Sequence, residues 1–165
     1  MDKLLIREML PEDLAEVCRI ERDNFSMPWS EKSFMESMQR ADTVFLTALF
    51  EQEIVGYVGC YCIDGVGEIT NVAVKSSFRR RGVGGKLLEA LYEKGALLNT
   101  GQFFLEVRES NEGAIRLYSE QGFVKEGIRK NFYEKPLENA VIMWKRQEDY
   151  CHQFPLGIRR ENKYD

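Results

Sequence analysis

A strand-to-helix junction dense in glycine and arginine sets the strongest limit on the architecture of this chain. It runs Arg79-Arg80-Arg81-Gly82-Val83-Gly84-Gly85-Lys86. Residues 68–74 before it are typical of a strand, and from Gly82 onward apolar residues recur at helical spacing. Glycines here let the backbone approach a ligand closely. Free amides at the helix start, the helix dipole and three arginines then favour a polyanion such as a pyrophosphate.

Two familiar nucleotide-binding motifs do not fit this junction. A Walker A loop needs a glycine six residues before the lysine, and Arg80 stands there before Lys86. A dinucleotide fingerprint needs a glycine three residues after Gly84, where Leu87 stands. The pattern that does fit is Arg-x-x-Gly-x-Gly, formed by Arg79, Gly82 and Gly84. For these six residues alone, a glycine-rich turn with solvated arginines is the structural alternative.

The pattern of apolar and turn residues predicts one α/β domain over residues 1–147 and a polar tail at 148–165 without assigned structure. Strands form hairpins at both ends of the domain and alternate with helices between them, which predicts a sheet of mixed direction. Gly65 and Gly67 are interpreted as turn residues ahead of a strand. The expected strands are 4–8, 43–50, 54–63, 68–74, 103–107, 123–132 and 140–145, and the expected helices open at Pro11, Ser30, Gly82 and Asn111.

Composition narrows the class of protein further. The net charge of −4 argues against broad nucleic-acid binding, which needs a surplus of Lys and Arg. No run of about 18 apolar residues exists, so a membrane span is not expected. The residues 1–4 lack the basic-then-apolar build of a secretory signal. A cytoplasmic protein is therefore predicted.

The cysteines and the single histidine do not form a metal-binding pattern. Cys60 and Cys62 stand two apart in an alternating run, so they should share one strand face as small buried side chains. His152 is the only histidine and adjoins Cys151 in the polar tail. No metal site is expected, because further ligands at suitable spacing are missing. A Ser-His or Cys-His nucleophile is disfavoured because the only histidine lies in the tail.

Several separated motifs resemble one known superfamily. The Arg79-x-x-Gly82-x-Gly84 pattern after 71–74 (Asn-Val-Ala-Val) resembles the cofactor motif of the GCN5-related N-acetyltransferases (GNAT). Within that superfamily, the chain is similar to bacterial ribosomal-protein-alanine acetyltransferases of the RimI type over about residues 4–144. The motifs that carry this likeness are 21–30, 105–108, 110–111, 117–118, 122–123 and 129–133.

The resemblance implies a GNAT fold and acetyl-CoA as the cosubstrate. The strand at 68–74 should splay from the strand at 103–107 and open a V-shaped cleft. Backbone groups of Val72, Ala73 and Val74 would pair with the pantetheine arm, and Asn111 would contact that arm as well. The pyrophosphate would rest on the turn that follows, formed by Arg79, Arg80, Arg81, Gly82, Val83, Gly84 and Gly85.

The resemblance also implies a catalytic pair, with Glu106 as the base and Tyr118 as the acid. Acetyl transfer needs a neutral amine, a polarised thioester carbonyl and a proton for the leaving thiolate. Amides near Val72 can polarise the carbonyl as an oxyanion site does. Glu106 stands in a run too apolar for an idle exposed carboxylate, and its structural alternative is pairing with Arg108 on the same strand face. The alternative for Tyr118 is a core tyrosine.

The acceptor is expected opposite the cofactor, between Phe25 and Trp29 on one side and the loop carrying Tyr133 on the other. The structural alternative is that Phe25 and Trp29 only staple the first two helices to the sheet. Glu21 is interpreted as a solvated helix glutamate rather than an acceptor contact. The predicted function is acetylation of the N-terminal alanine of a small-subunit ribosomal protein, protein eighteen in the family. Acetylation of lysine or small amines, or a non-catalytic acetyl-CoA-binding module, stand as alternatives.

Overall fold

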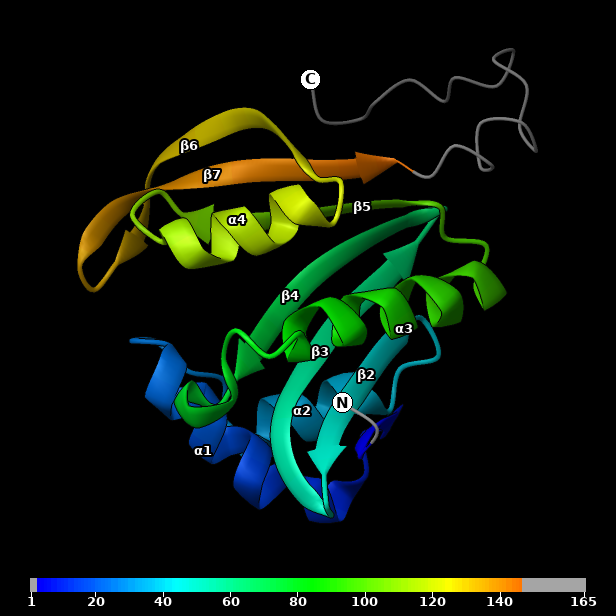
Figure 1. Cartoon of the computed structure of the whole chain (residues 1–165). Coiled ribbons are helices and arrows are strands. Elements are labelled where there is room, and N and C mark those ends of the chain that lie inside the picture. The colour runs from blue at the N-terminus through cyan, green and yellow to red at the C-terminus, as the bar shows by residue number, and fades with distance from the viewer. Residues whose placement is uncertain (1–2, 147–165) are drawn as a thin grey trace.

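The computed structural model describes residues 3–146, which form a seven-stranded mixed sheet with helices on both faces (Figure 1). The order of strands across the sheet is β1-β2-β3-β4-β5-β7-β6. The expected tail at 148–165, including Cys151 and His152, lies outside the described residues. The strands are β1 (Leu4–Glu8), β2 (Thr43–Phe50), β3 (Glu53–Ile63), β4 (Val66–Val74), β5 (Gln102–Arg108), β6 (Val124–Glu134) and β7 (Leu137–Arg146).

Four α-helices connect these strands, and their starts follow from capping chemistry. The Ser30 hydroxyl accepts a hydrogen bond from the amide of Ser33, and the Asn111 side chain accepts one from the amide of Ala114. Both caps confirm the sequence prediction. Pro11 opens a short 3₁₀ turn rather than the helix itself, and within residues 3–146 no helix is long and apolar enough to span a membrane. The helices are α1 (Leu14–Asn24), α2 (Glu31–Met38), α3 (Val83–Leu97) and α4 (Glu112–Glu120).

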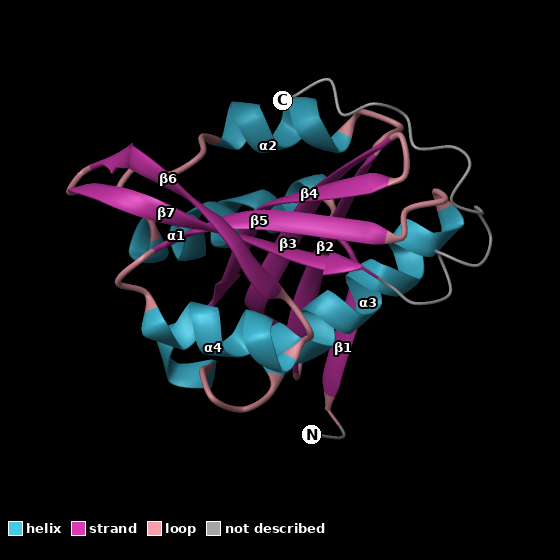
Figure 2. Ribbon diagram, turned by 90° about the horizontal axis from the view of Figure 1, so that it is seen from above, coloured by secondary structure: helices cyan, strands magenta, loops and turns pink. Residues whose placement is uncertain are grey.

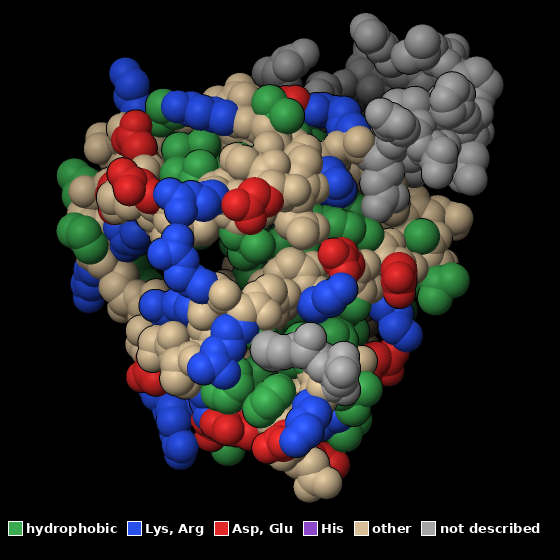
Figure 3. Space-filling view, viewed as in Figure 1, with side chains coloured by type: hydrophobic (Ala, Val, Ile, Leu, Met, Phe, Trp, Pro, Cys, Tyr) green, Lys and Arg blue, Asp and Glu red, His purple; other side chains and the backbone are tan. Residues whose placement is uncertain are grey.

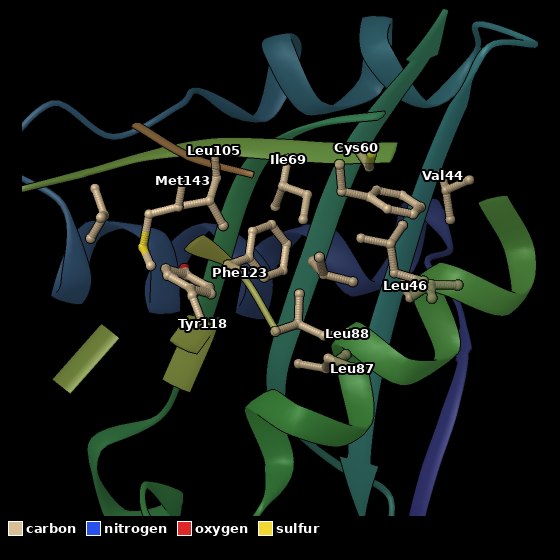
Figure 4. Packing of buried hydrophobic residues seen from close by; sticks show 14 of the residues in the cluster. Val44, Leu46, Cys60, Ile69, Leu87, Leu88, Leu105, Tyr118, Phe123 and Met143 are labelled. Atoms are coloured by element: carbon tan, nitrogen blue, oxygen red, sulfur yellow. The ribbon is translucent and has the colours of Figure 1, made fainter. Parts of the chain in front are cut away.

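Each face of the sheet has its own apolar core. On one face, α3 inserts Leu87, Leu88 and Leu91 against β2 and β3, and Tyr118 and Phe123 extend this core toward β5 and β7 (Figure 4). On the other face, α1 and α2 pack against the sheet. Figure 2 shows α2 on one side of the strands and α3 and α4 on the opposite side. The two-sided burial explains why the central strands are nearly continuous in apolar residues.

The sheet opens between β4 and β5, as predicted. This is the one parallel pair in the described sheet, and its register covers only Val66–Gln102, Gly67–Phe103 and Glu68–Phe104. Beyond Glu68 the two strands separate, which Figure 1 shows as diverging ribbons. Beyond that point the facing backbone edges of β4 and β5 do not pair with each other, so their hydrogen-bonding groups are available to a ligand.

Three local expectations about turns were wrong. Gly67 lies inside β4 rather than in the preceding turn. Glu51 and Gln52, both at positive φ, form the turn between β2 and β3, and Glu53 already belongs to β3. The expected loop around Tyr133 is part of β6, where an irregularity in the pairing with β7 falls between Arg129 and Tyr133.

The prediction for Cys60 and Cys62 is confirmed. Both side chains are buried on one face of β3, with the sulfur atoms 3.9 Å apart. The pKa of Cys62 is lowered to about 7, first by its contact with the Cys60 thiol, against the effect of burial. The pair thus forms part of the core.

Gly67 is a position where a side chain would disturb the sheet directly. A Cβ there would lie 2.5 Å from a ring carbon of Phe103, whose side chain is completely buried. We expect Gly67→Ala to lower the free energy of unfolding by about 2 kcal/mol, since the ring has no room to move. Gly113→Ala is the matched control, because a Cβ on this exposed helical glycine meets nothing within 4 Å. It should stabilise α4 by roughly 0.5–1 kcal/mol. Urea unfolding measures both, and equal stability of the two variants would refute the packing argument.

Candidate active site

The N-terminal end of α3 has the geometry of an anion site. Gly82 is the N-cap at φ 82°, and Arg80 before it is at φ 60°. The amide of Lys86 donates to the carbonyl of Gly82 at 3.1 Å and closes the first turn. Amides ahead of Lys86 precede that turn and can reach a ligand. Figure 3 shows Lys and Arg side chains gathered near this end of α3, beside a hollow in the surface.

Gly82 and Gly84 are each needed for a different physical reason. This corrects the expectation that both glycines make room for a ligand. Gly82 needs its left-handed backbone, and a Cβ there would meet only open space. At Gly84 a Cβ would lie 2.8 Å from a methyl carbon of Leu117. The absence of a side chain at Gly84 therefore lets α4 pack against the start of α3. Gly85 is half-buried, and a Cβ there would lie 3.2 Å from the side-chain nitrogen of Gln121.

The three arginines are all exposed but lie in different surroundings. Arg79 donates to the side-chain oxygen of Asn24 at 2.5 Å, which ties the junction to the last turn of α1. The Arg81 guanidinium lies over the Phe78 ring, 5.1 Å from its centre. Positive charge at the junction is thus anchored on both sides of Arg80.

The cofactor-strand residues lie on the open side of the sheet. Val72 and Val74 are half-buried against the α3 core, whereas Ala73 is buried in the core beneath α1 and α2. All three pair with β3 through one edge of β4, opposite Val58, Tyr57 and Gly56. The other edge of β4 at these positions has no partner in the β5 register, so it faces the opening.

Glu106 lies on β5 at the same opening. Its side chain is 18% exposed, and its Oε1 accepts from Nη1 of Arg129 at 2.5 Å. The alternative pairing with Arg108 is not found, because Arg108 pairs with Glu138 at 3.3 Å. Leu105 and Val107 point into the core on the opposite face of the strand. The alternation of β5 therefore places Glu106 on the face of the strand away from that core.

Tyr133 lies close enough to both Tyr118 and Glu106 for their charges to interact. Tyr118, on α4, is buried, packs against the Phe123 ring, and is labelled in Figure 4. Burial raises the pKa of Tyr118 above its usual value, and the charge of Tyr133 adds to that rise. Burial raises the pKa of Tyr133 to about 12, with a further contribution from the charge of Glu106. Both phenols therefore keep their protons at neutral pH.

Arg108 joins the two walls of the expected acceptor site, a role that sequence reasoning missed. It donates to the Ser26 hydroxyl at 3.2 Å and to the carbonyl of Pro136 at 2.9 Å. Its guanidinium also lies 4.4 Å from the centre of the Tyr133 ring. Local sequence gives no signal for these contacts, because Ser26, Arg108 and Pro136 are far apart along the chain.

The aromatic residues proposed for the acceptor wall differ in burial. Phe25 is 38% exposed at the end of α1. The half-buried Trp29 ring packs against Phe34 and Phe45, with ring centres 5.3 and 6.3 Å apart. Trp29 thus does staple the first helices to the sheet, as the structural alternative expected.

Two acidic residues near the opening were misread or missed. Glu21 is 2% exposed and hydrogen-bonded, so its interpretation as a solvated glutamate was wrong. Glu68, at the last paired position of β4, was not singled out. Burial raises the pKa of Glu68, and the charge of Glu106 raises it further, while Arg129 opposes the change.

A match of the GNAT acetyltransferase family model to residues 14–123 gives the class of this protein: the chain belongs to that family of acyltransferases. Among its relatives, the [ribosomal protein bS18]-alanine N-acetyltransferase of Haemophilus ducreyi is 32% identical over 142 residues, which cover 84% of this chain and 97% of the relative. The enzyme of that name from Escherichia coli K12 is 33% identical over 137 residues, which cover 79% and 89%.

Solved structures show the same fold. The crystal structure of the Escherichia coli ribosomal-protein-S18-alanine N-acetyltransferase matches with a TM-score of 0.78 and 29% identity, covering 87% of this chain and 93% of the other. Ard1 from Thermoplasma volcanium matches with a TM-score of 0.81 and 28% identity, covering 88% and 98%. The predicted GNAT fold is confirmed.

Proposed function

We propose that this protein transfers acetyl from acetyl-CoA to the N-terminal alanine of ribosomal protein bS18. The relatives that bear this activity in their names align with the chain over most of their length. The structural observation that carries the proposal is the carboxylate of Glu106 on β5, close enough to the protonated phenol of Tyr133 for its charge to raise that pKa, just beyond the point where β4 and β5 separate.

The residues at the opening fit coenzyme A. Its pyrophosphate would be held by the amides and charge of residues 79–85, where a Cβ on Gly82 would meet nothing within 4 Å. The free edge of Val72, Ala73 and Val74 would pair with the pantetheine arm. The Asn111 oxygen caps α4, which leaves its amide nitrogen for that arm. When bound, acetyl-CoA supplies the acetyl thioester.

The protein groups have separable parts in the proposed reaction. Glu106 takes a proton from the attacking amine through a water molecule, and the amide near Val72 stabilises charge on the thioester oxygen. Tyr118 donates its proton to the departing thiolate. Tyr118 is protonated at neutral pH, so a proton is available at this phenol when the thiolate forms. Phe25, Trp29 and Tyr133 line the acceptor side.

A protein α-amine suits this site better than a lysine amine does. The pKa of an α-amine is about 8, against about 10.4 for lysine, so near neutral pH on the order of a tenth of α-amines are uncharged. A carboxylate acting through water then has to remove a proton from a less basic amine. Lysine would require additional desolvation to reach the same state.

The experiment is a competition among acceptors at fixed acetyl-CoA. We expect a peptide beginning Ala-Arg to be acetylated at its α-amine, with kcat/KM at least about tenfold above that for a lysine peptide or a polyamine. The same Ala-Arg peptide with a blocked N-terminus is the matched control and should show no turnover. Mass spectrometry locates the acetyl group. Preference for the lysine peptide or the polyamine would contradict the proposal.

A further inference from the structure

The buried side chain of Glu21 joins elements that the chemistry must keep in register. Glu21 lies in the last part of α1 and is 2% exposed. Its Oε1 accepts from the backbone amide of Trp29 at 3.3 Å and from the side-chain nitrogen of Asn71 at 3.0 Å. Its Oε2 accepts from the Tyr57 hydroxyl. One carboxylate oxygen therefore connects the α1–α2 loop with β4.

Both ends of this connection lie beside groups that have a place in the proposed reaction. Trp29 is proposed for the wall of the acceptor site, in addition to its packing against Phe34 and Phe45, and Asn71 directly precedes Val72 on β4. The Asn71 side-chain oxygen is buried and has no hydrogen-bond partner within residues 3–146. The contact with Glu21 is therefore the polar contact that orients this amide in the described structure.

The surroundings of Glu21 favour a bridging role over a general structural one. Burial raises the pKa of Glu21, and the hydrogen bonds from Tyr57, Trp29 and Asn71 oppose that rise. A carboxylate placed so deeply costs stability, which its three donors only partly offset. An apolar side chain here would leave the donors of Tyr57, Trp29 and Asn71 without their acceptor, so the oxygen atoms, and not only the bulk of the side chain, matter at this position.

We propose that Glu21 is a positioning residue, whose Oε1 holds the acceptor loop at Trp29 and the cofactor strand at Asn71 in one fixed relation. This inference rests on the proposed acetyltransferase function for its kinetic consequence. Glu21 touches neither reactant. It acts through the main chain of the loop and of β4, where a shift of about 1 Å in either wall is enough to slow acetyl transfer.

Three variants distinguish the effect of the Oε1 contacts with Trp29 and Asn71 from the effects of the Glu21 charge and of overall stability. Glu21→Met keeps the length of the side chain and removes both acceptors. Glu21→Gln keeps one oxygen for Trp29 and Asn71, while its amide group can donate to the Tyr57 hydroxyl. Tyr57→Phe removes only the hydrogen bond to Oε2 and leaves the bridge intact. If Glu21→Met does not fold, Asn71→Leu, which removes one donor to Oε1, takes the place of Glu21→Met in the comparison.

We expect Glu21→Met to lower kcat/KM for the Ala-Arg peptide by about tenfold or more, with the acetyl-CoA dissociation constant within about twofold of wild type. Glu21→Gln and Tyr57→Phe should both stay within about threefold of wild type in kcat/KM. Equal kinetics for Glu21→Met and Tyr57→Phe would overturn the inference. A loss in Glu21→Gln as large as that in Glu21→Met would also overturn it, because charge rather than the bridge would then matter.

Amide hydrogen exchange tests the same bridge without any acceptor. Glu21→Met should speed exchange in the α1–α2 loop, including the amide of Trp29, and Tyr57→Phe should leave that loop as in wild type. Unchanged loop exchange in Glu21→Met would refute the positioning role. If wild-type protein fails to acetylate the Ala-Arg peptide, the proposed function fails, and the exchange result still decides the role of Glu21.

Discussion

Replacing Glu106 by glutamine should lower kcat by about 100-fold or more while acetyl-CoA binding stays close to wild type. Glutamine preserves the shape of the side chain, and its oxygen can still accept from Arg129, so the local packing is kept. What it loses is the ability to take a proton from the attacking amine. We propose that acetyl-CoA is bound by the separate region around Gly82, so its binding should be spared.

Glu68→Gln is the matched control for the base. Glu68 stands on the other side of the opening, close enough for the charge of Glu106 to raise its pKa. The same substitution there removes a carboxylate from the same opening, and we expect kcat to fall by less than about tenfold. If Glu68→Gln had a lower kcat than Glu106→Gln, Glu68 rather than Glu106 would be assigned as the base. Steady-state rates and calorimetric binding of acetyl-CoA distinguish these cases.

Tyr118→Phe should lower kcat by about 100-fold, because the departing thiolate would lose its proton donor. The phenol is buried, so the change removes one oxygen and keeps the ring contact with Phe123. The raised pKa of Tyr118 adds a second expectation. The phenol stays protonated beyond its usual value near 10, so wild-type activity should not fall on account of Tyr118 below that pH.

Tyr133→Phe is the matched control for the acid, since Tyr133 is a second phenol at the site, half-buried and close enough to Glu106 to feel its charge. Its loss should raise the KM for the acceptor peptide more than it lowers kcat, as expected for a residue of the acceptor wall. Full turnover in Tyr118→Phe would exclude it as the acid. Rates with both variants at saturating acetyl-CoA make the comparison.

The parts of the fold that depend on local chemistry could be predicted from sequence. The strands at 4–8 and 43–50 are found with the predicted ends, and Ser30 and Asn111 cap their helices as expected. Alternation and capping act over a few residues, so they are visible in the sequence. Gly67 could not be placed, because its reason is the Phe103 ring, which arrives from a strand 36 positions later.

The candidate site divides in the same way. The amide-lined junction at 79–86 follows from glycine, charge and a helix start, all of them local. The proposed roles of Glu106 and Tyr118 came from resemblance, and their partners did not. The Glu106–Arg129 pair, the contacts of Arg108 and the burial of Glu21 all join distant segments. Sequence spacing carries no signal for such contacts until the sheet order is known.

Because the parallel ladder between β4 and β5 is short, bound acetyl-CoA would stabilise the fold as well as take part in the reaction. Only three residue pairs join the strands there. A pantetheine arm along β4 would continue the ladder where protein pairing stops. Saturation at a hundred times the dissociation constant adds about 2.7 kcal/mol to the stability of the folded chain. The lifetime of this enzyme against unfolding and proteolysis should then track the supply of acetyl-CoA, linking the amount of catalyst to the metabolic state that feeds it.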